Sequence, residues 1–118
     1  KEIGESFLKA GKAEDAEFFF RESLKQVGEN MSEQEKEGAV HTYNRLGIAL
    51  RRQGKWAEAV KEYEQAVKIG PNNEVLYYNL GKAHLEGGQR PEARKCFQKA
   101  LLIDPEFQEA KEEFDAIS

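Results

Sequence analysis

Seven landmark positions recur at one fixed spacing, and this recurrence constrains the fold of the 118-residue chain more than any other feature. Large apolar, small and helix-ending residues all keep the register, as two copies of one helix pair require. The matched positions lie 34 residues apart: Leu46-Gly47 and Leu80-Gly81, Gly54 and Gly88, Ala59 and Ala93, Tyr63 and Phe97, Ala66 and Ala100, Ile69 and Ile103, Pro71 and Pro105.

A weaker third copy lies upstream of these two. Its landmarks, Ile3-Gly4, Gly11, Ala16 and Phe20, precede those of the next copy by 43 residues, so this copy carries nine extra residues, around 28–38. Ser32 with Glu35 forms a capping box, which begins the following helix early. We therefore expect the surplus to lengthen both flanking helices by a turn or two each, and not to form a loose loop.

The local pattern between these landmarks is helical. The chain has only three prolines, and apolar residues recur at steps of three and four. Gly11, Gly54 and Gly88 stand just past expected helix ends, where a left-handed residue closes a helix. The pattern predicts no strand and helices at about 1–10, 13–28, 33–53, 56–69, 74–87, 91–103 and 106–117.

The landmarks together resemble the tetratricopeptide repeat; in the second copy they are Tyr43, Leu46-Gly47, Gly54, Ala59, Tyr63, Ala66 and Pro71. Departures are Ser23 in place of an alanine, the lack of a closing proline in the first copy, and Leu50 and His84 in place of an aromatic residue. The resemblance implies an all-α, right-handed superhelix (α-solenoid) of three antiparallel helix pairs with a C-terminal capping helix. The repeats would span about 1–39, 40–73 and 74–107, and the capping helix about 106–117.

Charge and composition exclude several classes of partner. With 18 basic and 22 acidic side chains the net charge is −4, so the chain is poorly suited to neutralise nucleic-acid phosphates. Apolar runs are too short to span a bilayer. The single cysteine and the lack of a signal-peptide pattern favour a cytoplasmic location. The first residue is Lys1 and not methionine, which indicates a fragment or a processed chain whose upstream targeting signal would not be visible.

The candidates for chemistry are few. His41 and His84 lie one helix pair apart, and His84 occupies a position that is apolar in the neighbouring copy, so we interpret it as a satisfied, partly buried side chain. Cys96 has basic neighbours but no histidine placed to act as a base. We therefore predict no catalytic residues, no metal site and no cofactor.

The resemblance places a ligand groove along the first helix of each pair. That surface implies a peptide site at His41, Asn44, Arg45, Ile48, Arg51, Arg52, Tyr78, Asn79 and Lys82, with Val75, Leu85, Glu86, Lys1, Glu2, Glu5 and Leu8 beside them. The family's carboxylate clamp for chaperone C-termini has Lys and Asn where this chain has Asn44 and Ile48, and only Asn79 agrees. An acidic or mixed peptide is therefore the better interpretation, although the basic side chains would also serve simply to solvate a helix.

Two functions follow from this reading. The first is a non-catalytic protein interaction module that binds a peptide as an adaptor or scaffold part of a larger protein. The alternative is an architectural or oligomerisation module. Phe18 and Phe19 motivate the second, because Phe18 to Phe20 span more of a helix than one packing face covers. We expect at least one of the two to face outward and to contact an upstream part of the chain or a second copy.

Overall fold

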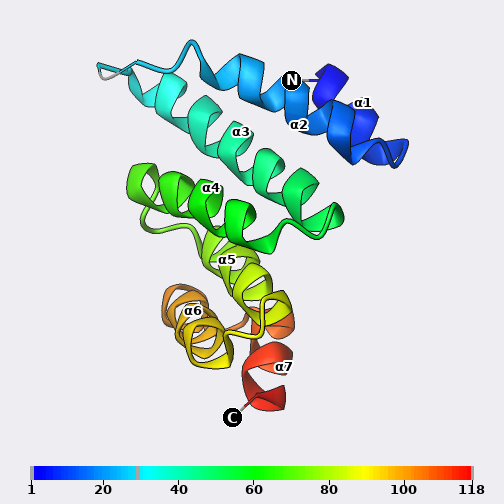
Figure 1. Cartoon of the computed structure of the whole chain (residues 1–118). Coiled ribbons are helices and arrows are strands. Elements are labelled where there is room, and N and C mark those ends of the chain that lie inside the picture. The colour runs from blue at the N-terminus through cyan, green and yellow to red at the C-terminus, as the bar shows by residue number, and fades with distance from the viewer. Residues whose placement is uncertain (1, 29, 118) are drawn as a thin grey trace.

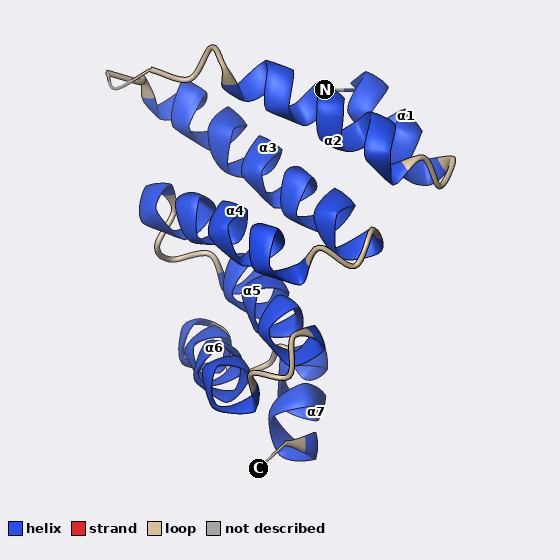
Figure 2. Ribbon diagram, in the orientation of Figure 1, coloured by secondary structure: helices blue, strands red, loops and turns tan. Residues whose placement is uncertain are grey.

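The computed structural model describes residues 2–28 and 30–117, with side chains from residue 4 onward. Within these residues all regular structure is helical (Figure 2). The helices are α1 (Glu2–Lys9), α2 (Ala13–Leu24), α3 (Glu33–Arg52), α4 (Trp56–Ile69), α5 (Glu74–Glu86), α6 (Arg90–Ile103) and α7 (Gln108–Ala116). They stack one after another from α1 to α7, as Figure 1 shows, which makes the chain an α-solenoid.

A glycine lies in the turn between the two helices of each pair, as the sequence predicts. Gly11, Gly54 and Gly88 have φ angles of +76°, +78° and +76°. This left-handed conformation is strained for residues with a Cβ and costs glycine little. The three identical turns set the same antiparallel geometry in α1–α2, α3–α4 and α5–α6.

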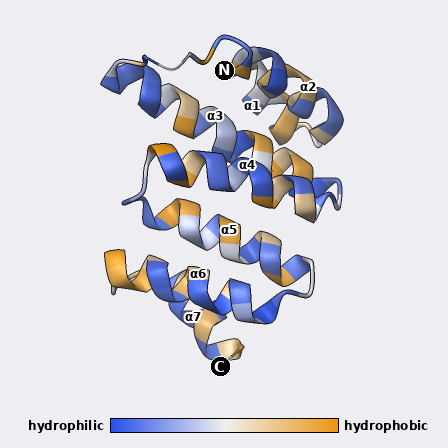
Figure 3. Cartoon of the chain, turned by 60° about the vertical axis from the view of Figure 1, so that its left-hand side comes forward, coloured by the Kyte–Doolittle hydropathy of each residue, from blue (hydrophilic) through white to orange (hydrophobic). Residues whose placement is uncertain are grey.

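Small residues bring the helices into close contact. The repeated alanines are fully buried, and so are the aromatic landmarks Phe20, Tyr63 and Phe97. Figure 3 shows that every helix carries both apolar and polar residues. The buried alanines at the repeated positions are Ala16, Ala59, Ala66, Ala93 and Ala100. Because each helix pair buries its apolar face against the next pair, the core runs along the stack as one connected cluster, from Leu8 in α1 to Ala83 in α5.

The surplus residues lengthen only one of the two flanking helices. α3 has 20 residues against 13 in α5, and the capping box at Ser32 and Glu35 is formed, as predicted. α2 ends at Leu24 and has 12 residues, so the expected helix to residue 28 is wrong. Ser23 Oγ donates to the Phe19 carbonyl, and the following turn tightens, with Val27 N–H bonded to Leu24. The N–H groups of Lys25, Gln26 and Val27 each bond three residues back, as at a tightened helix end.

The capping helix also begins later than predicted. α7 begins at Gln108 and not at residue 106, because the Asp104 carboxylate accepts the Glu106 N–H and stabilises a turn there. Ala110 is the buried contact of α7, and Arg94 of α6 lies 4.7 Å from the centroid of the Phe114 ring. The C-terminal end of the stack is thereby covered by a short helix with charged residues outside.

Candidate functional site

The first helices of the three pairs and α7 form one continuous surface, here termed the A-helix face. Each helix of this face is joined to the next by polar side-chain contacts, made by residues at corresponding positions. Most side chains that the sequence assigns to a peptide groove lie in these contacts. Lys1 lies outside the described residues, as does the Glu2 side chain.

Between α1 and α3 the bridging residue is Glu5. Its Oε1 lies 2.9 Å from His41 Nε2 and 3.1 Å from Arg45 Nε. The hydrogen bond from His41 and the charge of Arg45 hold the pKa of Glu5 below its usual value, so it is ionised at neutral pH. Further along the same two helices, Arg52 Nη1 of α3 donates a hydrogen bond to the Leu8 carbonyl of α1 at 2.6 Å.

Between α3 and α5 there are two bridges. Arg51 binds the Glu86 carboxylate with two nitrogens, at 3.0 and 2.8 Å. Burial by itself lowers the pKa of Arg51, but the bonds to Glu86 raise it above its ordinary value, so the guanidinium stays charged. The second bridge is neutral: Asn79 Nδ2 donates to Asn44 Oδ1 at 2.7 Å.

Between α5 and α7 the contact is again ionic. Lys82 Nζ lies 2.9 Å from Glu113 Oε2, and both side chains are about a quarter exposed. The four groove cations predicted from the sequence are therefore all engaged, three with carboxylates and Arg52 with a carbonyl. The A-helix face presents both signs of charge and is not a bare basic patch.

A hollow of about 330 Å³ opens on this face between α3 and α5. It is lined by Glu86 and by four residues of the predicted groove: Ile48, Arg51, Arg52 and Asn79. His41 and Asn44 line a second hollow nearer the start of α3. Tyr78 lies elsewhere, in an aromatic cluster 5.8 Å from Phe97 and 5.2 Å from Phe107, measured between ring centroids.

The residues considered for chemistry have structural surroundings. His84 Nδ1 lies 2.7 Å from Gln89 Oε1 at the turn that closes α5, which agrees with a satisfied histidine. Burial raises the pKa of the Cys96 thiol to about 11, so it is protonated at neutral pH and its basic neighbours do not activate it. In residues 2–28 and 30–117 no three His, Cys, Asp or Glu side chains gather as metal ligands. None of the helices in this part of the chain combines the length and hydropathy needed to cross a membrane.

The acidic partners on this face are what sequence reasoning missed. Glu86 stands beside the predicted groove, but the sequence shows neither its bond to Arg51 nor the pairing of Glu113 with Lys82. The signal was available in the numbering: Arg51 and Glu86 lie 35 residues apart, one more than the repeat length. Residues on neighbouring first helices at that separation face each other, as the Asn44–Asn79 pair also does.

An all-helical stack of repeated pairs with a polar face along its first helices defines a helical-repeat protein. Two family models match, a TPR repeat over residues 47–88 and a tetratricopeptide repeat over residues 75–107. The second tetratricopeptide domain of human RPAP3, solved in complex with the HSP70 peptide SGPTIEEVD, superposes with a TM-score of 0.86 at 25% identity and covers 99% of this chain and 90% of that one. The chain belongs to the tetratricopeptide repeat family.

Further relatives agree with this assignment. The first tetratricopeptide domain of Spaghetti (RPAP3), bound to the HSP90 peptide SRMEEVD, has a TM-score of 0.84 at 22% identity, over 99% of this chain and 86% of that one. The chloroplastic tetratricopeptide repeat domain-containing protein PYG7 of Arabidopsis thaliana is 32% identical over 78 residues, which are 66% of this chain and 26% of PYG7. Hsp70-Hsp90 organizing protein 3 of the same plant is 34% identical over 52% of this chain and 11% of its own length. The chain thus spans about a quarter or less of these two relatives.

Proposed function

We propose that the chain is a non-catalytic interaction module that binds an extended peptide segment of mixed charge along the A-helix face, as an adaptor or scaffold part of a larger protein. The observation that carries this proposal is the alternation of paired cations and anions across α1, α3, α5 and α7. The two RPAP3 domains that share its fold hold HSP70 and HSP90 peptides. Their ligands support the peptide class, and the charge pattern supports a mixed peptide over a purely acidic one.

A peptide of mixed charge suits this face because its charged groups can replace the protein's own partners in the ion pairs. A ligand carboxylate approaching Lys82 competes with Glu113, and a ligand ammonium approaching Glu86 competes with Arg51. A ligand with both signs can replace both halves of a bridge, so that no ion remains unpaired. A purely acidic ligand would leave the displaced carboxylates facing its own charges.

The test distinguishes an effect of the charge on the A-helix face from an effect on the stability of the protein. Peptides are selected from a displayed random library on the protein, and their affinities are measured by fluorescence anisotropy for the protein, for Lys82→Glu and for the swap Lys82→Glu with Glu113→Lys. The single change places two carboxylates together and should weaken binding by about tenfold or more. The swap restores the bridge with reversed polarity, so it should restore stability without restoring the original affinity.

The outcome that contradicts the proposal is equally concrete. If no peptide is selected, or if the selected peptides bind all three proteins equally, the A-helix face is not the ligand site. Leu102→Ser serves as the control, because Leu102 is exposed on α6.

The architectural alternative keeps one specific observation in its favour. Phe18 on α2 is 69% exposed, which is unusual for so large an apolar side chain. A concentration-dependent dimer that disappears on replacement of Phe18 would support this function.

A further inference from the structure

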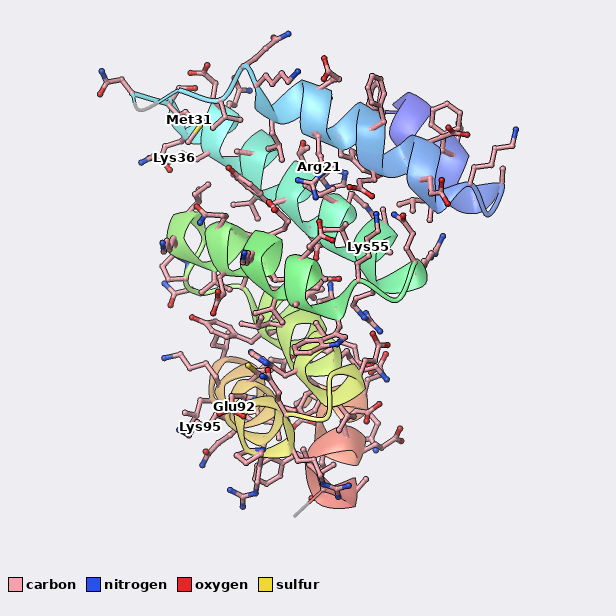
Figure 4. All side chains as sticks on the ribbon, viewed as in Figure 1. Arg21, Met31, Lys36, Lys55, Glu92 and Lys95 are labelled. Atoms are coloured by element: carbon pink, nitrogen blue, oxygen red, sulfur yellow. The ribbon has the colours of Figure 1, made fainter. Side chains whose placement is uncertain are left out.

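The early start of α3 forms one wall of a cleft beside the connection between α4 and α5. α3 begins seven residues earlier than the position equivalent to the start of α5, so about two extra turns project beside the α4–α5 connection. Figure 4 shows Lys36 on these turns, above the end of α4. The space between the extension, Ile69 and the first turn of α5 is a hollow of about 420 Å³, here termed the α3–α5 cleft.

The floor of the cleft is apolar. Val40, Ile69, Val75 and Leu76 line it, and Val75 is 45% exposed, one of the few large aliphatic side chains of the described residues that solvent reaches so well. At the base, Gly70 leaves room that a side chain would fill: a Cβ there would lie 3.4 Å from Val40 Cγ2. A hollow of this size lies within the range of protein ligand pockets, and its aliphatic floor suits an apolar side chain.

The rim of the cleft is acidic. Glu33 and Glu37 line it together with Lys36. Lys36 Nζ lies 3.5 Å from Glu33, so these two charges offset one another. Glu37 is exposed and makes no ion pair with any residue that the structure describes. The uncompensated charge at the mouth is therefore negative, and a cation is its complement.

The cleft continues into the A-helix face. His41 and Asn44 line the cleft, while the same two side chains bond to Glu5 and Asn79 on that face. A peptide lying along the face therefore reaches the cleft without turning away from the protein.

We infer that the α3–α5 cleft takes an aliphatic side chain of a partner segment whose neighbouring residue is arginine or lysine. The aliphatic group displaces water from Val40, Ile69 and Val75, and the cation lies against Glu37. This inference rests on the proposed function, because it names the anchor residue of the peptide that the A-helix face binds. It commits the cleft to a partner protein and not to a second copy of this chain.

The probe is N-acetyl-leucyl-arginine amide, compared with N-acetyl-leucyl-glutamate amide and N-acetyl-seryl-arginine amide. Binding is followed by the NMR shifts of the backbone amides of Gly70 and Leu76 in the intact chain. The leucyl-arginine probe should produce saturable shifts at both amides. The seryl probe should bind about tenfold more weakly, because the buried aliphatic group is lost. The leucyl-glutamate probe should bind about fivefold more weakly, in line with one exposed ion pair.

Three variants locate the effect. Val75→Ser should abolish the shifts at Gly70 and Leu76, and Glu37→Gln should remove the preference for arginine over glutamate. Leu102→Ser is the matched control, since Leu102 is an exposed aliphatic residue on α6, and it should change neither. Equal binding of the three probes, or shifts that persist in Val75→Ser, would overturn the inference.

The same experiment distinguishes this inference from the proposed function. A protein that binds selected peptides through Lys82 but shows no response to the dipeptide probes retains the function and loses the anchor. A dimer that dissociates in Val75→Ser would assign the cleft to a second copy and would also overturn the inference.

Discussion

Gly47 of α3 lies directly against the ring of Tyr63 of α4, at a separation that leaves no room for a side chain. A Cβ on Gly47 would stand 2.5 Å from Tyr63 Cε1. The same contact recurs in the next pair, where a Cβ on Gly81 would stand 2.7 Å from Phe97. The glycine of the Leu-Gly landmark is thus a packing residue within a helix, and the aromatic landmark 16 residues later is what requires it.

The first prediction tests this contact. Gly47→Ala should lower the free energy of unfolding by about 1–3 kcal/mol, because the added methyl group collides with the buried Tyr63 ring. Gly38→Ala, in the same helix, meets nothing within 4 Å and should raise it by about 0.5–1 kcal/mol through helix propensity. Urea denaturation followed by circular dichroism measures both. Equal effects of the two changes would contradict the assigned contact.

The Tyr63 hydroxyl gives a second prediction. Its oxygen is buried and has no partner at good hydrogen-bond geometry within the described residues. Burial raises the pKa of Tyr63 to about 12, and the neighbouring Arg51 acts in the opposite direction. The corresponding residues of the other two copies are Phe20 and Phe97. Tyr63→Phe should therefore raise the free energy of unfolding by about 1 kcal/mol, since an unsatisfied polar group is removed.

The control for this change is Tyr43→Phe, because Tyr43 is only half-buried. Its replacement should leave the urea midpoint almost unchanged. A loss of stability in Tyr63→Phe would show that the hydroxyl makes a favourable contact with the neighbouring Arg51.

The fold could be predicted from the sequence because its determinants are local and repeated. The left-handed glycines, the capping box at Ser32 and the alanine contacts each depend on residues close in the chain or one repeat away. The end of α2 could not be predicted, because no proline or capping residue marks it between Leu24 and Gly28, where the chain closes in three-residue turns. The repeated landmarks carry strong local signals, whereas this helix end carries none.

The candidate site was predicted less completely, for a reason of the same kind. The resemblance to the tetratricopeptide repeat places Arg45, Arg51 and Lys82 on one face, but it does not show which side chains of the neighbouring helices reach them. Pairing depends on the separation and tilt of first helices, and those are set by the small residues at the crossings. The sequence therefore predicts where these cations lie but not the carboxylates with which they pair.

A third prediction concerns Glu17, the centre of a network that joins α2 to the start of α4. Arg21, Gln53 and Lys55 all bond to its carboxylate, at 2.8 to 3.3 Å (Figure 4 labels Arg21 and Lys55). Burial alone would raise the pKa of Glu17, but these three donors outweigh it and hold the pKa below the ordinary value of 4.5.

A carboxyl group with a lowered pKa stabilises the folded state above its unfolded pKa, and this contribution is lost as the pH falls through the folded pKa. Glu17→Gln should therefore lower the free energy of unfolding by about 1–2 kcal/mol at pH 7. The difference from the unmodified protein should shrink as the pH falls below 4.5. Thermal melts across this range measure it, with Glu14→Gln, an exposed carboxyl on the same helix, as control. A difference that does not depend on pH would show that the charge of Glu17 is not what stabilises the network.

The last prediction concerns the two phenylalanines of α2, which the structure separates. Phe18 is exposed, as expected of at least one of the pair. Phe19 is half-buried: its ring meets Phe20 edge to face with centroids 5.9 Å apart, and it lies against Gly4. Replacing both at once would therefore mix a surface change with damage to the core.

The two residues should accordingly be replaced singly. Phe18→Lys should leave the free energy of unfolding within about 0.5 kcal/mol of the unmodified protein, as surface substitutions do. Phe19→Ala should cost about 2–3 kcal/mol, less than a fully buried phenylalanine, because part of its ring remains in solvent. If α2 forms an interface between copies, sedimentation velocity will show an association that Phe18→Lys abolishes at unchanged stability. A stability loss in Phe18→Lys equal to that of Phe19→Ala would place both rings in the core and rule out this surface as an interface.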